Sequence, residues 1–279
     1  MISLRNYTVS ENFSLLVVRK TISSIISPEL SMFLLFFVSL LSCFSNKVID
    51  QRMTTSLVIT QEIILKCEKE SSTECKMIGS SVTGTATRIK WEDNYYWLTA
   101  AHVCSTAAFS GQVSMGRIVS FRVGGSNEEE VSKSITFNVK KDLCIIPAKP
   151  GPHRVISSHN PSLGSRVSLV AYPGGAFDPR MLPIYEGRYA GQFEDMCSVT
   201  IPVSGGSSGS SVLNEDLEIV GVVSAVMKTF NHFTIVTCLT DVRAFLSLAA
   251  EQAQKFESQG SQILTQPSDL GAAAPLLVE

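Results

Sequence analysis

Short runs of apolar or alternating residues, separated by turn residues, occupy the chain from about residue 77 onward. Clusters of Gly, Pro, Asn and Asp lie between these runs, which is typical of strands joined by turns. The pattern therefore predicts an all-β domain, either a sandwich or a barrel. The expected strands are 80–91, 94–100, 112–123, 134–139, 143–148, 166–172, 197–203, 218–226 and 232–239.

After the last expected strand, the apolar spacing changes to that of a helix. Residues 240–256 fit this period, and Thr240 is suited to cap the start of the helix. We expect one domain over 77–255 that ends in this helix, followed by a tail over 256–279 that shows no period and is predicted to be disordered. The apolar face of the helix consists of Val242, Phe245, Leu246 and Ala249.

The N-terminal part contains an uncharged segment, 30–46, with a dense apolar centre. Its length is at the short end for a membrane-spanning helix and also fits the apolar region of a signal peptide. The extension before it, 1–29, is long for a signal peptide, so we favour a membrane anchor, followed by a linker over 47–76. Hydrophobicity on all sides argues against a buried helix. We expect membrane association, with no orientation indicated by the flanking basic residues.

Composition and charge narrow the function classes. The 279 residues are 44% hydrophobic and carry a net charge of −2, which suits one domain with extensions. No basic excess indicates nucleic-acid binding. The seven cysteines include no CxxC pair and the histidines form no HExxH pattern, so neither a metal nor another cofactor is expected. The odd number of cysteines leaves at least one thiol unpaired in the monomer, and Cys67 and Cys75 could close a small loop.

The stretch PVSGGSSGSSVLN, 202–214, is either a flexible linker or the site of a nucleophilic serine. A serine needs a base for its proton and an anion that orients the base. His102 ends an apolar strand, where a scaffold can present a side chain to a cleft, although such a histidine is often only structural. Asp142 opens the apolar run 143–148, where it would be partly desolvated, although a turn aspartate is common there.

Two serines of this stretch are candidates for the nucleophile. Ser207 would be the centre of a GxSxG elbow, but such an elbow belongs to a strand–turn–helix, and strands follow here instead of a helix. The alternative is Ser208 as the nucleophile. Gly206 then lets the backbone turn its N–H toward the site, and Gly209 leaves the exit free of a side chain. The N–H groups of Gly206 and Ser208 could form an oxyanion hole.

In order, the chain contains TAAHVC, DLCIIP, GSSGSS and EIVGVVSAV. This series resembles the trypsin-like serine peptidases of the chymotrypsin fold, and AYPGG at 171–175 and the C-terminal helix resemble further features of that family. The resemblance implies two β-barrels and a catalytic triad of His102, Asp142 and Ser208. The stretch GSSGSS departs from the family's commoner GDSGGP at three serines but keeps its GxSG.

The same resemblance carries Ser224, Ala225 and Val226 onto the wall of the pocket for the P1 side chain, with Ser224 near the triad aspartate. A small or apolar P1 residue is therefore expected. Pro202, six residues before Ser208, lacks the carboxylate that basic P1 side chains require. His232 is an alternative reader of Gln or Glu at P1. Cys104 and Cys144 are expected to be small core residues.

We expect a serine endopeptidase that acts on polypeptides. The apolar segment followed by a compact peptidase resembles the membrane-anchored proteases of sobemoviruses and luteoviruses, which implies processing of its own polyprotein. Alternatives are a cellular HtrA-like or secreted trypsin-like peptidase, although no PDZ-sized segment follows the domain, and an inactive binding module at a membrane.

Overall fold

The structure is a computed structural model that describes residues 52–67, 75–126, 129–226 and 232–258. These residues belong to one compact unit, 50–279. The expected extension 1–29, the expected anchor 30–46 and the tail from residue 259 lie outside the described residues. Within the described ranges, no helix combines the length and apolar character needed to span a membrane.

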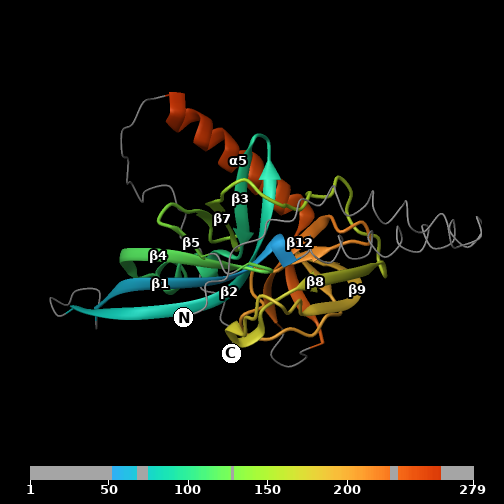
Figure 1. Ribbon diagram of the computed structural model, residues 1–279, viewed down its shortest axis with the longest axis horizontal. Helices are drawn as coiled ribbons and strands as arrows, with labels where there is room; N and C mark the ends of the chain where they lie inside the picture. Colours follow the sequence, from blue (N-terminus) through green and yellow to red (C-terminus); the bar gives the residue numbers. More distant parts are fainter. Residues whose placement is uncertain (1–51, 68–74, 127–128, 227–231, 259–279) are drawn as a thin grey trace, which may run out of the picture. The chain divides into compact units, whose positions relative to one another are not determined.

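The first half of the unit is a seven-stranded antiparallel sheet (Figure 1). Its strand order is β5-β4-β1-β2-β3-β7-β6. Two short helices follow β3 directly and lead into β4. The elements are β1 (Thr55–Cys67), β2 (Cys75–Trp91), β3 (Asn94–Thr99), α3 (Ala101–Cys104), α4 (Thr106–Ser110), β4 (Val113–Val123), β5 (Glu129–Ser132), β6 (Thr136–Asn138) and β7 (Leu143–Pro147).

The second half is a closed barrel with the order β10-β13-β12-β11-β8-β9. A helix of twenty residues, α5, follows the last strand and is the red helix of Figure 1. The elements are β8 (Arg166–Val170), the short helix η1 (Pro173–Gly175), β9 (Ile184–Phe193), β10 (Met196–Val199), β11 (Ser211–Leu213), β12 (Ile219–Val226), β13 (Thr234–Cys238) and α5 (Leu239–Ser258).

The predicted pair of barrels is thus found only in part, because strand pairing closes the second half and not the first. In the first half, β5 pairs only with β4 and β6 only with β7, so both remain edges of the sheet. Side chains join β5 to the strands across from it. Glu130 of β5 accepts hydrogen bonds from Arg88 at 2.9 Å and from the indole N–H of Trp97 at 3.0 Å.

The segment that the sequence interpretation treated as a linker, 47–76, contains β1. This strand lies between β2 and β4 and pairs with both along most of its length. Strands β5, β9 and β11 were also not predicted. Two of them are only three or four residues long, and β9 contains glycines at 187 and 191 that weaken its strand pattern.

The C-terminal helix and its apolar face are confirmed. Helix α5 begins at Leu239 and ends at Ser258, two residues beyond the predicted end. Its buried face packs in a cluster with Leu98 and Leu143 of the sheet and with Ile219 of the barrel, so the helix stabilises the contact between the two halves. The buried residues of the helix include Val242, Phe245, Leu246 and Ala249.

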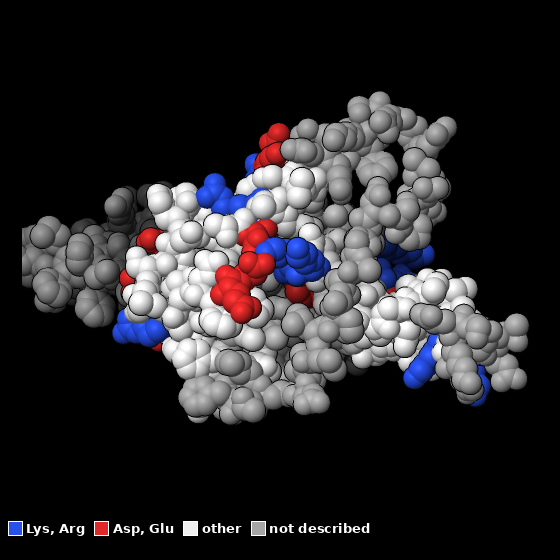
Figure 2. Space-filling view, turned by 180° about the vertical axis from the view of Figure 1, so that it is seen from behind, with Lys and Arg blue, Asp and Glu red and all other residues white. Residues whose placement is uncertain are grey.

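On the face that Figure 2 shows, acidic and basic side chains lie next to one another rather than in separate areas of one sign. Among the ion pairs of the described residues, Arg166 with Glu186 and Arg180 with Asp178 lie at the surface. A surface of mixed sign produces little long-range attraction for a polyanion.

Candidate active site

His102 and Asp142 are in direct contact where the first helix after β3 meets the start of β7. His102 is in α3, immediately after β3, and Asp142 immediately precedes β7, the strand that pairs with β3. The imidazole Nδ1 is 2.8 Å from Oδ2 of Asp142, and the backbone N–H of His102 donates to Oδ1 at 3.0 Å. Both the ring and the main chain of His102 are therefore held by one carboxylate.

The backbone at Asp142 has a left-handed conformation, with φ of 51°. Aspartate is one of the few residues besides glycine that adopts this region at modest cost. The turn is fixed from the second half of the unit, because Thr237 of β13 donates to the carbonyl of Lys141 at 2.8 Å and the Lys141 ammonium lies 3.1 Å from Asp241 of α5. The direction of the Asp142 side chain is thus set by both halves.

Ser224 lies on β12 at an irregularity of the strand pairing. The register between β12 and β13 shifts between Val223 and Ala225, so Ser224 is an extra residue that bulges from the ladder. Its hydroxyl donates a hydrogen bond to Oδ2 of Asp142. The structure thus places Ser224 beside the carboxylate, as the resemblance implied, and the bulge supplies the geometry.

Ser208 lies in the turn before β11, and backbone hydrogen bonds to both the sheet and the barrel hold this turn. The Ser208 carbonyl accepts from the N–H of Thr85 in β2 at 2.8 Å, and the N–H of Gly209 donates to the carbonyl of Val223 at 2.8 Å. A Cβ atom on Gly209 would lie 2.4 Å from the Thr85 carbonyl oxygen and 2.8 Å from the Ala100 nitrogen. The close approach to the strand end before His102 therefore requires glycine at 209.

Ser208 also comes near the His102 segment at Gly84 of β2. A Cβ atom on Gly84 would lie 2.6 Å from Val103, the neighbour of His102, and 3.0 Å from the Ser208 carbonyl oxygen. Among the described residues, no hydrogen bond joins the imidazole of His102 to the Ser208 hydroxyl. Hydrogen bonds of this kind often tighten only when substrate is present.

The N–H groups of Gly206 and Ser208 point away from the body of the turn. The carbonyl of Gly205 accepts from Gly174, and the carbonyl of Ser207 accepts from Ser210 at 3.1 Å. Because C=O and N–H of a trans peptide point in opposite directions, the next N–H in each case faces the other side. Within the described chain, neither N–H donates to a backbone carbonyl.

Sequence reasoning missed the part that Thr85 takes in this arrangement. Its hydroxyl donates to the Gly206 carbonyl at 2.9 Å and accepts from the N–H of Tyr172 at 3.1 Å. It thereby joins the serine turn to the AYPGG segment, 171–175. A threonine within a strand gives no sequence signal of such a role.

The other two residues assigned to the pocket wall, Ala225 and Val226, end β12 and are exposed. His232 is exposed as well and lies close in sequence to 227–231, which are outside the described residues. The role of these residues in substrate binding stays a prediction. Among the described residues, no cluster of His, Cys, Asp and Glu could hold a metal ion.

Cys104 and Cys144, beside the site, are buried in the core as expected, and they also form a disulfide that was not expected. The two lie on α3 and β7, each two positions after His102 or Asp142, and pair with a Cα–Cα distance of 6.6 Å. Both are fully buried. The expected loop closed by Cys67 and Cys75 is present as a disulfide, and Cys197 pairs with Cys238.

We expect the Cys104–Cys144 disulfide to stabilise the fold more than the one at 67–75. The loss of loop entropy from the unfolded chain corresponds to about 4 kcal/mol for a separation of 40 residues and about 2.5 kcal/mol for 8 residues. Urea unfolding of Cys104→Ala/Cys144→Ala and of Cys67→Ala/Cys75→Ala measures both losses. A larger loss from the second pair would contradict this ranking.

Comparison with known proteins places part of the chain in a family. Residues 83–222 match the trypsin-like peptidase domain, and this span contains His102, Asp142 and Ser208. No curated protein matches the sequence.

Several solved structures share the fold. The Rv3671c protease from M. tuberculosis in its active form is 17% identical, with a TM-score of 0.54 over 72% of this chain and 84% of that one. An HtrA-type protease, AlgW, in a structure with a decapeptide, is 17% identical, with a TM-score of 0.54 over 78% and 68%. The thermostable serine protease AL20 from an extremophilic microorganism is 11% identical, with a TM-score of 0.52 over 72% and 98%. At these identities the likeness concerns the fold alone, whereas the match to residues 83–222 establishes the family: the chain belongs to the trypsin-like peptidases.

Proposed function

We propose that the protein is a serine endopeptidase that uses His102, Asp142 and Ser208. The observation that carries this proposal is the fixed His102–Asp142 pair beside a glycine turn with two outward N–H groups. A binding module has no need for this combination, which argues against the alternative of an inactive peptidase fold.

The geometry assigns a role to each group in acyl transfer. Nδ1–H of His102 donates to Asp142, so that Nε2 is left as the acceptor of a proton. Ser208 Oγ attacks the peptide carbonyl while Nε2 takes its proton and later gives it to the leaving amine. The N–H groups of Gly206 and Ser208 stabilise the oxyanion. Water then attacks the acyl-enzyme while Nε2 takes its proton, and Nε2 gives the proton to Ser208 Oγ as the acid product is released.

The carboxylate of Asp142 stabilises the imidazolium that forms in this reaction. Its oxygens accept from the backbone of His102, from the imidazole and from Ser224. These bonds fix the ring in one tautomer and one orientation, which is the main contribution of the aspartate in such triads.

Of the two kinds of peptidase, the HtrA-like or secreted kind has more support than the viral one. An HtrA-type protease is among the structural neighbours, and none of the three neighbours described above is a polyprotein-processing protease by its description. The described residues also contain three disulfides, which form and persist in oxidising compartments. Attachment to a membrane through 30–46 stays a prediction.

A fluorophosphonate probe, which reacts with activated serines, tests the proposal on the full-length chain. We expect the probe to label the wild type and Ser207→Ala but not Ser208→Ala. Ser207 is the matched control because it is the adjacent serine and is buried. Labelling that persists in Ser208→Ala would place the nucleophile elsewhere. A folded wild type that is not labelled would support the inactive binding module.

A further inference from the structure

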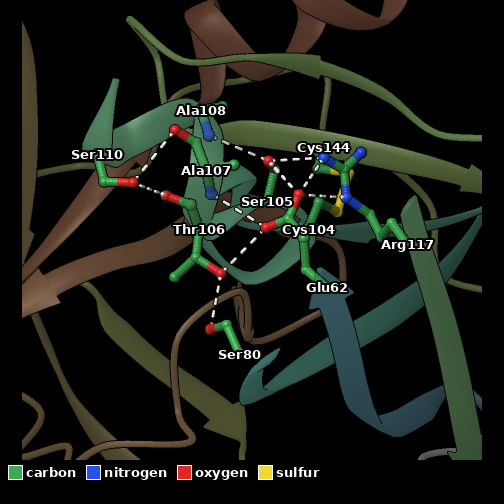
Figure 3. Close-up of polar contacts among 10 residues, drawn as sticks. All are labelled: Glu62, Ser80, Cys104, Ser105, Thr106, Ala107, Ala108, Ser110, Arg117 and Cys144. Carbon is green, nitrogen blue, oxygen red and sulfur yellow. Dashed lines mark hydrogen bonds and ion pairs between the residues drawn. A yellow bond between two sulfur atoms is a disulfide. The ribbon is translucent and has the colours of Figure 1, made fainter. Parts of the chain in front are cut away.

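A buried carboxylate that the proposed chemistry does not use lies beside the segment that carries His102 (Figure 3). Glu62 is on β1 and is 2% exposed. On one side it faces Arg117 of β4, whose Nε donates to Oε1 at 3.0 Å and whose Nη2 makes a second bond to the same oxygen. Two N–H groups of the guanidinium thus donate to the same oxygen of the carboxylate.

On its other side, Glu62 accepts from the α3–α4 turn, which consists of Ser105 between the helices and the first two residues of α4, Thr106 and Ala107. Ser105 donates its hydroxyl to Oε1 at 3.1 Å. Thr106 donates its hydroxyl to Oε2 at 3.1 Å, and the backbone N–H of Ala107 donates to the same oxygen at 3.0 Å. Figure 3 shows these three residues converging on the carboxylate from one direction. One buried side chain therefore holds three consecutive residues of the turn.

The carboxylate is ionised at neutral pH. Burial by itself raises the pKa of Glu62. The hydrogen bonds from the Ala107 N–H and from Arg117 outweigh this effect and lower the pKa to about 2. A buried charge is tolerated only when it is paired and fully hydrogen-bonded, and this one satisfies both conditions.

The turn that Glu62 holds determines the surroundings of His102. Ser105 ends α3 three residues after His102, and its Oγ also caps α4 by accepting from the N–H of Ala108 at 3.2 Å. Helix α4 in turn carries Phe109, whose ring lies edge-on to the imidazole with centroids 5.9 Å apart. The imidazole is thus set between Asp142 and Phe109, and the position of Phe109 depends on the anchored turn.

We propose that Glu62 is a positioning residue for His102, one that fixes the α3–α4 turn and thereby the orientation of the imidazole toward Ser208. This inference rests on the proposed function. A pair that only stabilised the fold would change the folded fraction and leave the reactivity of the folded protein unchanged. A positioning residue changes that reactivity, because misplacement by about 1 Å can lower a rate about 10²-fold.

Glu62→Gln keeps the size of the side chain but replaces one oxygen by an amide N–H₂ group. That group must face donors in either orientation, either Thr106 and Ala107 or Ser105 and Arg117. We expect the rate constant for fluorophosphonate labelling at saturation to fall about 10- to 100-fold, with the half-saturating probe concentration within about threefold of wild type. The measurement uses the full-length chain at a temperature where circular dichroism shows complete folding.

Glu186→Gln is the matched control, because Glu186 forms an ion pair with an arginine, Arg166, at the surface. We expect it to label at the wild-type rate. The proton resonance of His102 Nδ1–H, measured by NMR, adds a readout that does not depend on the serine. It should shift or broaden in Glu62→Gln and stay unchanged in Glu186→Gln. A fully folded Glu62→Gln with the wild-type rate and resonance would overturn the proposal.

Thr106→Val provides a second variant in case Glu62→Gln does not fold. It removes the hydroxyl bond to Glu62, together with a contact to the Ser80 hydroxyl, and preserves the shape of the side chain and the charge of the carboxylate. We expect a decrease of about three- to tenfold in the labelling rate of the folded protein. An unchanged rate and resonance in this variant would also overturn the proposal.

The outcomes separate the two proposals. A wild type that is never labelled contradicts the proposed peptidase activity, and the His102 resonance then still reports whether Glu62 positions the ring. A wild type that is labelled as fast as Glu62→Gln contradicts only the positioning role.

Discussion

Replacing Asp142 by Asn is expected to lower kcat for peptide hydrolysis about 10⁴-fold. The asparagine amide must present N–H₂ either to Nδ1 of His102 or to the backbone N–H of the same residue. The orientation that keeps the amide oxygen as the acceptor of the His102 backbone N–H makes the amide N–H₂ donate to Nδ1. The ring proton then moves to Nε2, and the histidine can no longer accept the proton of Ser208.

Steady-state kinetics on a peptide substrate, together with the rate of fluorophosphonate labelling, would measure this effect. Asp178→Asn is a suitable control, because Asp178 is also a hydrogen-bonded carboxylate but pairs with Arg180 at the surface. It should change kcat by less than about twofold. A loss below about tenfold in Asp142→Asn would mean that Asp142 does not set the tautomer of His102.

The strands that alternate or that form continuous apolar runs were predictable from the sequence, as was the C-terminal helix. The runs of aromatic and apolar residues in NYYWLT and LCIIP predict strands β3 and β7 directly. The open first sheet was not predictable, because its edges are set by where β5 and β6 stop pairing. The ends of this pairing depend on tertiary contacts, such as the ion pair of Glu130 with Arg88.

Strand β1 shows a different kind of miss. Its sequence, TSLVITQEIILKC, contains two apolar runs, 57–59 and 63–65, separated by three polar residues, and the charged Glu62 among these three is buried. A single-sequence pattern assigns a charged residue to the surface. The burial of the charge is explained only by distant partners, namely Arg117, 55 residues later, and the hydrogen-bond donors of residues 105–107.

The order of the site motifs was readable from the sequence, but their contacts depend on long-range geometry. The sequence placed His102 and Asp142 at a strand end and a strand start, and the β3–β7 pairing brings these points together. The bulge that directs Ser224 to Asp142 has no signature in EIVGVVSAV, because it arises from a register shift against β13. The Cys104–Cys144 disulfide follows from the same pairing, since Thr99 lies opposite Cys144.

The glycine turn offers the second large effect. Gly206 has φ of 91°, a region that side chains rarely adopt. A Cβ atom there would lie 2.5 Å from the Tyr172 carbonyl oxygen and 2.8 Å from the Gly174 nitrogen, and both are backbone atoms that cannot move aside easily. In Gly206→Ala, the peptide must therefore rotate, and its N–H leaves the oxyanion site.

We expect Gly206→Ala to lower kcat about 10²- to 10³-fold, the range for loss of one oxyanion donor, with a smaller change in KM. Gly205→Ala is the matched control, because a Cβ at 205 would meet nothing within 4 Å, and it should retain kcat within a few-fold. A peptide boronic acid, whose tetrahedral adduct places an oxygen in the same hole, should lose affinity in parallel with kcat in the first variant only. Unfolding curves of both variants separate this effect from loss of the fold. If folded Gly206→Ala keeps nearly wild-type turnover, other donors stabilise the oxyanion, and the assignment of the Gly206 N–H to the oxyanion hole is wrong.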